Sequence, residues 1–343
     1  MELESFSWKT GDGRTLEGLK TGSIKTGSIK SGRKTTGTDV TICLHGWLDN
    51  ANTFTNLMPK LPGVLGQIIA IDLPGHGLSD HLPPGGFYIV AAFALDVAEL
   101  ITCCFKDQTV TLLGHSLGAA VASTVAGILG DRVSRLILLD GLAPMSAPAS
   151  ETVALMRGAL GKRVKAESSP RFFKSLEEAA MRRASMNIGG QMLVEDAMLL
   201  AERGAVEEPG KGWKWRTDNR LLWPSVVRFS DESVKATLSE IKCEVLIVFA
   251  ADGLYKQLLL KFGLLGLSAV GSFLLWLAGI VVGGKTGAAM KMGSEVGRRV
   301  RCIEKRKVVL VAKGGHHVHL GKEGSEVVAG VIEEWCCGKV KFS

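Results

Sequence analysis

One serine lies where a nucleophile would be expected. Ser116 is the centre of a Gly-x-Ser-x-Gly box that runs from Gly114 to Gly118. The apolar run before the box predicts a strand, and the alanine-rich run after it predicts a helix. A serine hydroxyl is a weak nucleophile until a base and N–H donors surround it, and a sharp strand-to-helix turn lifts it clear of the backbone. This context favours a nucleophile over a chance match in a chain with 42 glycines.

The composition is that of a globular protein. The 343 residues are 46% hydrophobic and 22% charged, which is enough to bury a full core. The net charge of +7 is modest, and no basic stripe interleaved with aromatic residues indicates a nucleic-acid partner.

Cysteine usage and the start of the chain bear on location. The seven cysteines form no Cys-x-x-Cys pair, which favours reduced thiols, an intracellular compartment and no zinc site. The acidic first residues lack the apolar core of a secretory signal. We therefore expect the protein in the cytoplasm or on the cytoplasmic face of a membrane.

Strand-like and helix-like runs alternate along the chain. The pattern predicts a hairpin over 3–20, strands near 40–44, 67–71, 110–113, 135–139, 243–249 and 307–312, and helices near 88–105 and 324–336. Such alternation predicts a mostly parallel sheet covered by helices on both faces.

Three segments follow from this pattern. Residues 1–144 form the first part of a sheet domain, in which the polar repeat at 21–37 predicts a flexible loop. Residues 145–230 lack strand-like runs and repeat apolar residues at helical spacing, which predicts a helical lid. Residues 231–343 complete the sheet domain and carry an apolar and basic insertion at 258–305.

Several polar or glycine-rich turns follow predicted strands, where ligands bind in open parallel sheets. In this order the motifs resemble the α/β-hydrolase superfamily. The closest resemblance is to the serine hydrolase-like protein family, through LHGWLDNANTF at 44–54, GHSLGA at 114–119, RLILLDG at 135–141, LLAERG at 199–204 and RTDNRLLWPS at 216–225.

The resemblance implies roles for matching positions. Ser116 is expected to be the nucleophile and His316, which follows paired glycines, the general base. The backbone N–H groups of Trp47 and Leu117 are expected to form the oxyanion hole. His317 and His319 share the turn of His316 and are interpreted as structural residues.

Two aspartates compete for the role of the acid. Asp252 follows a predicted strand and keeps the chain order Ser116, Asp252, His316, although its turn departs from the usual superfamily pattern. Asp140 lies at the end of the strand after the nucleophile, a position used by some superfamily members. We favour Asp252 and keep Asp140 as the alternative.

These assignments predict a serine hydrolase. Attack by Ser116 on an acyl carbon, followed by water, is the expected acyl-enzyme route. The substrate would be a carboxylic ester or related acyl compound, small or lipid-like, shaped by the lid. No metal and no organic cofactor is expected.

One stretch conflicts with this interpretation. Residues 262–284 carry no charge and are long enough to cross a membrane. A single crossing would place Ser116 and His316 on opposite sides of about 30 Å of hydrocarbon. We therefore expect 258–305 to lie on a membrane surface, to form a re-entrant hairpin, to pack over the lid, or to be an aberrant addition. The alternative function is a catalytically inactive, membrane-associated protein on a hydrolase scaffold.

Overall fold

The main sheet joins both halves of the chain. The structure is a computed structural model that describes residues 2–22, 40–165, 170–186, 192–254 and 295–339. Within them the main sheet runs in the order β1 (Leu3–Lys9), β2 (Thr15–Thr21), β4 (Gln67–Ile71), β3 (Val40–Leu44), β5 (Val110–His115), β6 (Val133–Leu139), β9 (Glu244–Asp252) and β10 (Arg306–Gly315). β2 is antiparallel to β1 and β4, and the pairs from β4 to β10 are parallel.

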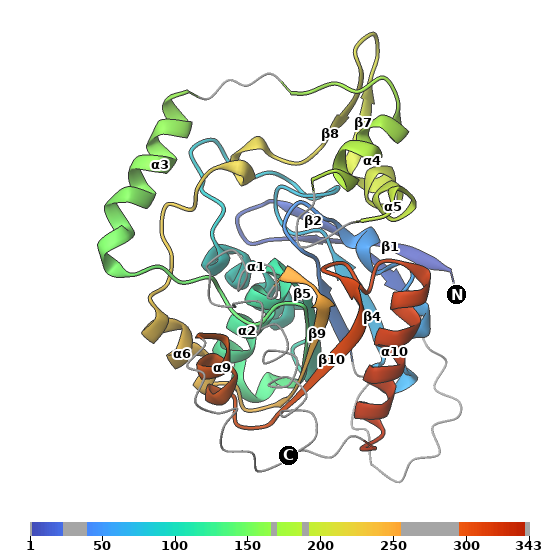
Figure 1. Ribbon diagram of the computed structural model, residues 1–343, viewed down its shortest axis with the longest axis vertical. Coiled ribbons are helices and arrows are strands. Elements are labelled where there is room, and N and C mark those ends of the chain that lie inside the picture. Colours follow the sequence, from blue (N-terminus) through green and yellow to red (C-terminus); the bar gives the residue numbers. More distant parts are fainter. Residues whose placement is uncertain (1, 23–39, 166–169, 187–191, 255–294, 340–343) are drawn as a thin grey trace, which may run out of the picture.

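Helices cover both faces of this sheet (Figure 1). One face carries α1 (Val90–Cys104), α2 (Leu117–Leu129), α6 (Asp231–Ser239) and α9 (Glu295–Cys302), and the other carries α10 (Lys322–Cys336). Neighbouring strand residues point to opposite faces, so Ile42 joins the first core and Cys43 the second. The predicted α/β-hydrolase architecture, a mostly parallel sheet between helices, is therefore confirmed.

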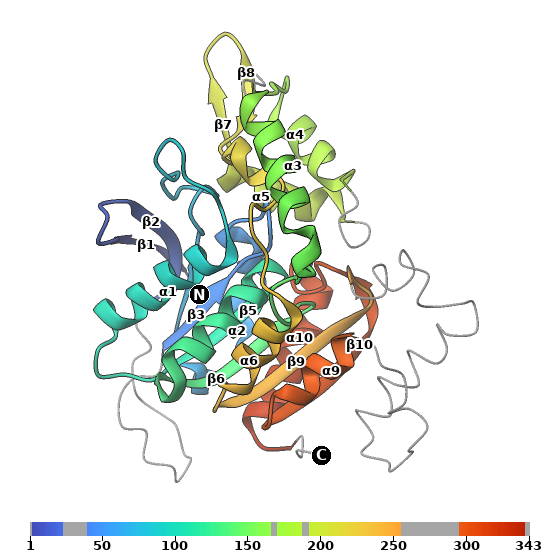
Figure 2. The same ribbon diagram turned by 90° about the vertical axis from the view of Figure 1, so that its left-hand side faces the viewer.

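The lid lies between β6 and α6 and stands above one end of the sheet (Figure 2). It contains α3 (Thr152–Val164), α4 (Leu176–Ala184) and α5 (Val194–Gly204), followed by a hairpin of β7 (Ala205–Glu208) and β8 (Gly212–Trp215). The expectation that 145–230 holds no strands is wrong at this hairpin. Each strand is four residues long, which is too short to show alternation, and Gly210 and Gly212 take positive φ in the turn.

Much of the segment that the sequence assigns to an insertion lies outside the described residues. The apolar stretch 262–284 is among the residues that are not described. Of the expected repeat loop 21–37, only residues 21 and 22 are described. No helix among the described ranges is long and apolar enough to cross a membrane.

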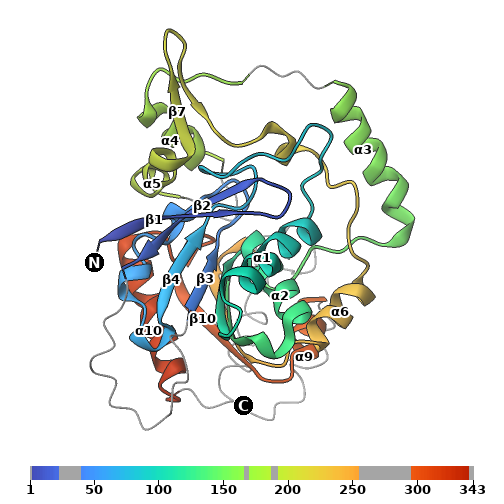
Figure 3. The ribbon, with the colours of Figure 1, turned by 180° about the vertical axis from the view of Figure 1, so that it is seen from behind.

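The end of that expected insertion belongs to the core. Val300 of α9 and the following Ile303 are buried in the core that also holds residues of α2 and α6. Arg299 binds the carboxylate of Asp231 in the first turn of α6 at 3.1 Å. The boundary expected at residue 305 is therefore wrong, because α9 packs as a helix of the sheet domain (Figure 3).

Candidate active site

Ser116 occupies a strained turn between a strand and a helix. It follows β5, precedes the first residue of α2 and has φ of 52° and ψ of −112°. Positive φ is uncommon for residues other than glycine and marks an enforced conformation. A side chain at Gly114 would lie 2.3 Å from the Gly118 carbonyl oxygen, so position 114 must be glycine for the helix to pack this closely on the strand. The turn leaves the Ser116 side chain half-buried at the end of the sheet.

His316 links this serine to a carboxylate. Its Nε2 lies 2.8 Å from Ser116 Oγ, and its Nδ1 lies 2.6 Å from Asp140 Oδ2. The carboxylate is an acceptor, so Nδ1 carries the proton and Nε2 is left to accept from the serine hydroxyl. His316 follows β10 directly and is almost fully buried. This is the hydrogen-bond order that a nucleophile, a general base and an orienting acid require.

The aspartate that reaches His316 is Asp140. It follows β6, lies fully buried and accepts hydrogen bonds from the backbone N–H groups of Ala250, at 3.2 Å, and Leu254, at 2.8 Å. Asp252 is exposed at the end of β9, and both ring nitrogens of His316 are bonded to other side chains. The structure therefore pairs His316 with the alternative residue, Asp140, and not with the expected Asp252. The turn after β9 supplies N–H donors to Asp140 and does not supply the carboxylate that meets His316.

The two expected oxyanion donors lie on segments that touch each other. Leu117 is the first residue of α2, where a backbone N–H has no partner within its own helix. Trp47 lies in the loop after β3. A side chain at Gly118 would lie 1.9 Å from the Leu44 carbonyl oxygen and 2.8 Å from that of His45, so this loop begins against the first turn of α2. Their role as an oxyanion hole stays a prediction.

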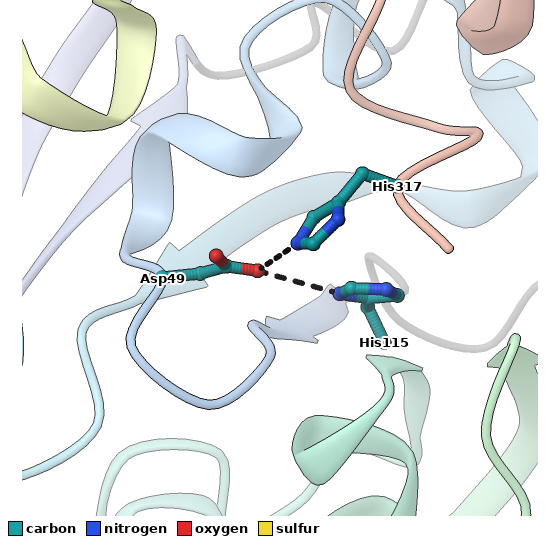
Figure 4. A group of neighbouring side chains, drawn as sticks. All are labelled: Asp49, His115 and His317. Atoms are coloured by element: carbon teal, nitrogen blue, oxygen red, sulfur yellow. Dashed lines mark hydrogen bonds and ion pairs between the residues drawn. The ribbon is translucent and has the colours of Figure 1, made fainter. Parts of the chain in front are cut away.

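Asp49, His115 and His317 form a second cluster of polar side chains (Figure 4). His317 Nε2 lies 3.1 Å from Asp49 Oδ2, and His115 Nδ1 lies 3.6 Å from the same oxygen. Arg183 of the lid donates from Nη2 to Asp49 Oδ1 at 2.6 Å. His115 Nε2 donates to the backbone carbonyl of His316 at 2.9 Å. The cluster therefore includes the residue before Ser116 and contacts the backbone of His316.

Burial dominates the electrostatics of this cluster. It lowers the pKa of His317 to about 4 and that of His319 well below the usual range. Burial, followed by the nearby His316, also lowers the pKa of His115. Burial by itself raises the pKa of Asp49, but His317 and Arg183 outweigh it and hold that pKa well below its usual range. At neutral pH the cluster thus combines a carboxylate, a guanidinium and neutral imidazoles.

This cluster is also the candidate metal site of the described residues. Ligand atoms of Asp49, His115 and His317 lie within 4.8 Å of one another, and two imidazoles with one carboxylate form a set that transition metals accept. Arg183 already neutralises the carboxylate, so a divalent ion would add uncompensated charge to a buried site. The donor set fits an ion pair with neutral histidines better than a metal centre. The expectation of no metal or organic cofactor stays a prediction.

Sequence reasoning missed Asp49 and Arg183. They lie 134 residues apart, and neither belongs to a motif that names a partner. The only available signal was an aspartate in the loop after β3. His319 was expected to be structural, and its Nε2 lies 3.0 Å from Thr53 Oγ1 in the buried interior.

Comparisons with known proteins agree with this architecture. A family model described as alpha/beta hydrolase fold matches residues 40–168. A serine hydrolase-like protein of Danio rerio is 30% identical over 226 residues, which cover 65% of this chain and 68% of that protein. A pimeloyl-[acyl-carrier protein] methyl ester esterase of Neisseria meningitidis is 37% identical over 121 residues, 35% of this chain and 43% of the esterase.

A solved structure extends the likeness over nearly the whole chain. A hypothetical protein from Pseudomonas aeruginosa PAO1 has a TM-score of 0.74 and 28% sequence identity, covering 97% of this chain and 99% of that one. The likeness thus includes the second half of the chain, where β10 and the turn after it place His316.

Proposed function

The chain belongs to the serine hydrolase-like family of α/β-hydrolases, and we propose that it cleaves carboxylic esters or related acyl compounds with Ser116 as nucleophile. Family membership points to a hydrolase. The observation that carries the finer proposal is the position of His316 between Ser116 Oγ, at 2.8 Å, and Asp140 Oδ2, at 2.6 Å.

The proposed reaction has two halves. His316 Nε2 takes the hydroxyl proton as Ser116 Oγ bonds to the acyl carbon, and returns it to the leaving alcohol when the tetrahedral intermediate collapses. Water then attacks the acyl-enzyme with His316 again as base, releasing the acid and the free serine. Asp140 keeps the Nδ1–H tautomer and stabilises the imidazolium in each half.

Backbone donors would stabilise the oxyanion. We assign this role to the N–H groups of Leu117 and Trp47, because the loop after β3 lies against the first turn of α2. Removing one such donor typically costs about 10²-fold or more in kcat. A backbone N–H survives side-chain substitution, so these two residues are poor targets for mutation.

An ester is the substrate class best supported. One relative, 37% identical over 121 residues, is named as a methyl ester esterase, and a serine nucleophile suits acyl transfer. The lid stands over the end of the sheet where Ser116 lies, so we propose that it shapes a small acyl or lipid-like substrate (Figure 2).

Burst kinetics test this function. The protein is mixed with p-nitrophenyl esters of increasing acyl length, and p-nitrophenol release is followed from the first milliseconds. We expect a burst of about one equivalent and then slower turnover, because p-nitrophenol leaves during acylation and the following deacylation is the slower step. A folded Ser116→Ala variant should show neither phase. Equal turnover by that variant would refute the proposed nucleophile.

A further inference from the structure

The loop that follows β3 is held by the lid at several points. Trp47 Nε1 donates to the Leu221 carbonyl at 3.0 Å. Asn50 Nδ2 donates to the Leu200 carbonyl and Asn52 Nδ2 to the Leu199 carbonyl, each at 2.8 Å. The loop that would supply an oxyanion donor therefore depends on the lid for much of its hydrogen bonding.

A fourth contact is an ion pair buried on both sides. Arg183 lies in the last turn of α4, a helix that Ser175 caps by accepting from the Glu178 N–H. The guanidinium reaches Asp49 Oδ1 at 2.6 Å, and the side chains of Arg183 and Asp49 are 4% and 0% exposed. A buried carboxylate and a buried guanidinium need each other, because either charge without its partner would strongly destabilise the fold.

Asp49 lies between Arg183 and His115, the residue before Ser116. His115 Nε2 carries a proton, because it donates to the His316 carbonyl at 2.9 Å. A neutral His115 therefore turns the lone pair of Nδ1 toward Asp49 Oδ2, 3.6 Å away. Among the described residues that nitrogen has no hydrogen-bond partner. Two acceptors that face each other repel, and Arg183 offsets this by neutralising the carboxylate.

Loss of Arg183 would favour a different proton position. With an uncompensated carboxylate beside it, His115 gains by carrying its proton on Nδ1, where it can donate to Asp49. A neutral His115 in that tautomer has no proton on Nε2 for the His316 carbonyl. The backbone of the base would then lose a buried hydrogen bond, and a shift of about 1 Å in a catalytic group can cost about 10²-fold in rate.

We propose that Arg183 of the lid is a positioning residue that acts through Asp49 and His115 to hold His316 against Ser116. Serine reactivity then depends on the lid being docked. This inference rests on the proposed function, because it concerns the reactivity of the same serine.

Fluorophosphonate labelling of Ser116 tests the proposal on the full chain. Wild type is compared with Arg183→Met, which removes the charge and keeps an unbranched side chain. Arg203→Met is the matched control, since Arg203 of α5 binds the buried Asp72 at 2.8 Å in a second ion pair between lid and core. Circular dichroism establishes that each variant is folded.

We expect Arg183→Met to label about 10²-fold more slowly than wild type, with kcat reduced and KM little changed. Arg203→Met should label within about threefold of wild type, since the ion pair of Arg203 is with Asp72 and not with Asp49, the carboxylate that faces His115. Arg183→Lys should recover much of the rate because it restores the charge.

A double variant separates charge from packing and covers the case in which Arg183→Met does not fold. Asp49→Asn removes the carboxylate charge, so Asp49→Asn/Arg183→Met should label faster than Arg183→Met and about as fast as Asp49→Asn. If folded Arg183→Met labels as fast as Arg203→Met, or if the double variant is much slower than Asp49→Asn, the proposal is wrong. A folded wild type that does not label would overturn the proposed function, and this inference with it.

Discussion

His316 and His317 are neighbours in the chain, and each is hydrogen-bonded to a buried aspartate, yet the two pairs are built differently. His316 meets Asp140 through Nδ1 and keeps Nε2 for Ser116, whereas His317 uses Nε2 to meet Asp49. Asp140 is held by neutral backbone N–H groups, whereas Asp49 is bound by the Arg183 guanidinium.

The difference shows what makes an aspartate–histidine pair useful for catalysis. In the part of the chain that the structure describes, Asp140 accepts from neutral backbone N–H groups and from His316, so its charge can stabilise an imidazolium on His316. The charge of Asp49 is already neutralised, and burial lowers the pKa of His317 to about 4. The first pair is suited to take up a proton, and the second is suited to stay fixed.

Exchanging each histidine for glutamine should produce the largest contrast. His316→Gln removes the base and should lower kcat/KM for an ester by about 10⁴-fold or more. His317→Gln leaves the bonds of His316 to Ser116 and Asp140 in place and should cost no more than about tenfold. Steady-state ester hydrolysis measures both values of kcat/KM. Similar losses in the two folded variants would show that the two pairs do not differ in their importance for catalysis.

The aspartates should differ almost as strongly. Asp140→Asn removes the charge behind His316 and favours the wrong tautomer, so kcat should fall by about 10⁴-fold. Asp252→Asn changes an exposed side chain and should stay within about twofold of wild type. The same ester assay measures kcat for both variants. A larger loss of kcat for Asp252→Asn than for Asp140→Asn would show that Asp252 is the acid.

Acid should weaken the fold through the second pair. The folded pKa of His317 is lowered to about 4 from an ordinary value of 6.5. Between those values the unfolded chain binds the extra proton, so stability is present above pH 6.5 and is lost as pH falls toward 4. This residue alone accounts for about 3 kcal/mol of that loss.

Urea unfolding at several pH values between 7.5 and 4 measures this slope. His317→Gln cannot titrate, so its stability should depend less steeply on pH than that of wild type. Equal slopes for the two proteins would show that His317 is not held neutral in the folded state.

The smallest effect should be on stability at neutral pH. His317→Gln weakens a buried hydrogen bond to Asp49 and should cost about 1–3 kcal/mol of the free energy of unfolding. His316→Gln should cost less, because residues placed for catalysis are seldom optimal for stability. Urea unfolding of both variants at pH 7.5 gives the comparison, and a larger loss for His316→Gln would contradict it.

The histidine of the first pair was readable from the sequence, but its aspartate and the second pair were not. Ser116 and His316 are marked by local patterns, a glycine-flanked elbow and a histidine after paired glycines. Asp140 and Asp252 both follow strands, so chain order could not decide which carboxylate reaches His316. That depends on the turn after β9, whose Leu254 N–H binds Asp140.

Asp49 and Arg183 meet only through the packing of the lid. Ala180 of α4 packs with Ala197 and Ala201 of α5, which sets where the end of α4 lies. Small residues at helical spacing predict that such helices pack closely, but not which core residue one of their arginines will reach. The β7–β8 hairpin was missed for a related reason, since its strands are too short for alternation to show.

Covalent labelling with a fluorophosphonate, followed by mass spectrometry of the peptides, tests most directly that the first pair activates a serine. We expect one adduct on folded wild type, located on Ser116, and no adduct on a folded Ser116→Ala variant. A folded wild type that stays unlabelled, or one that carries its adduct on another residue, would contradict it.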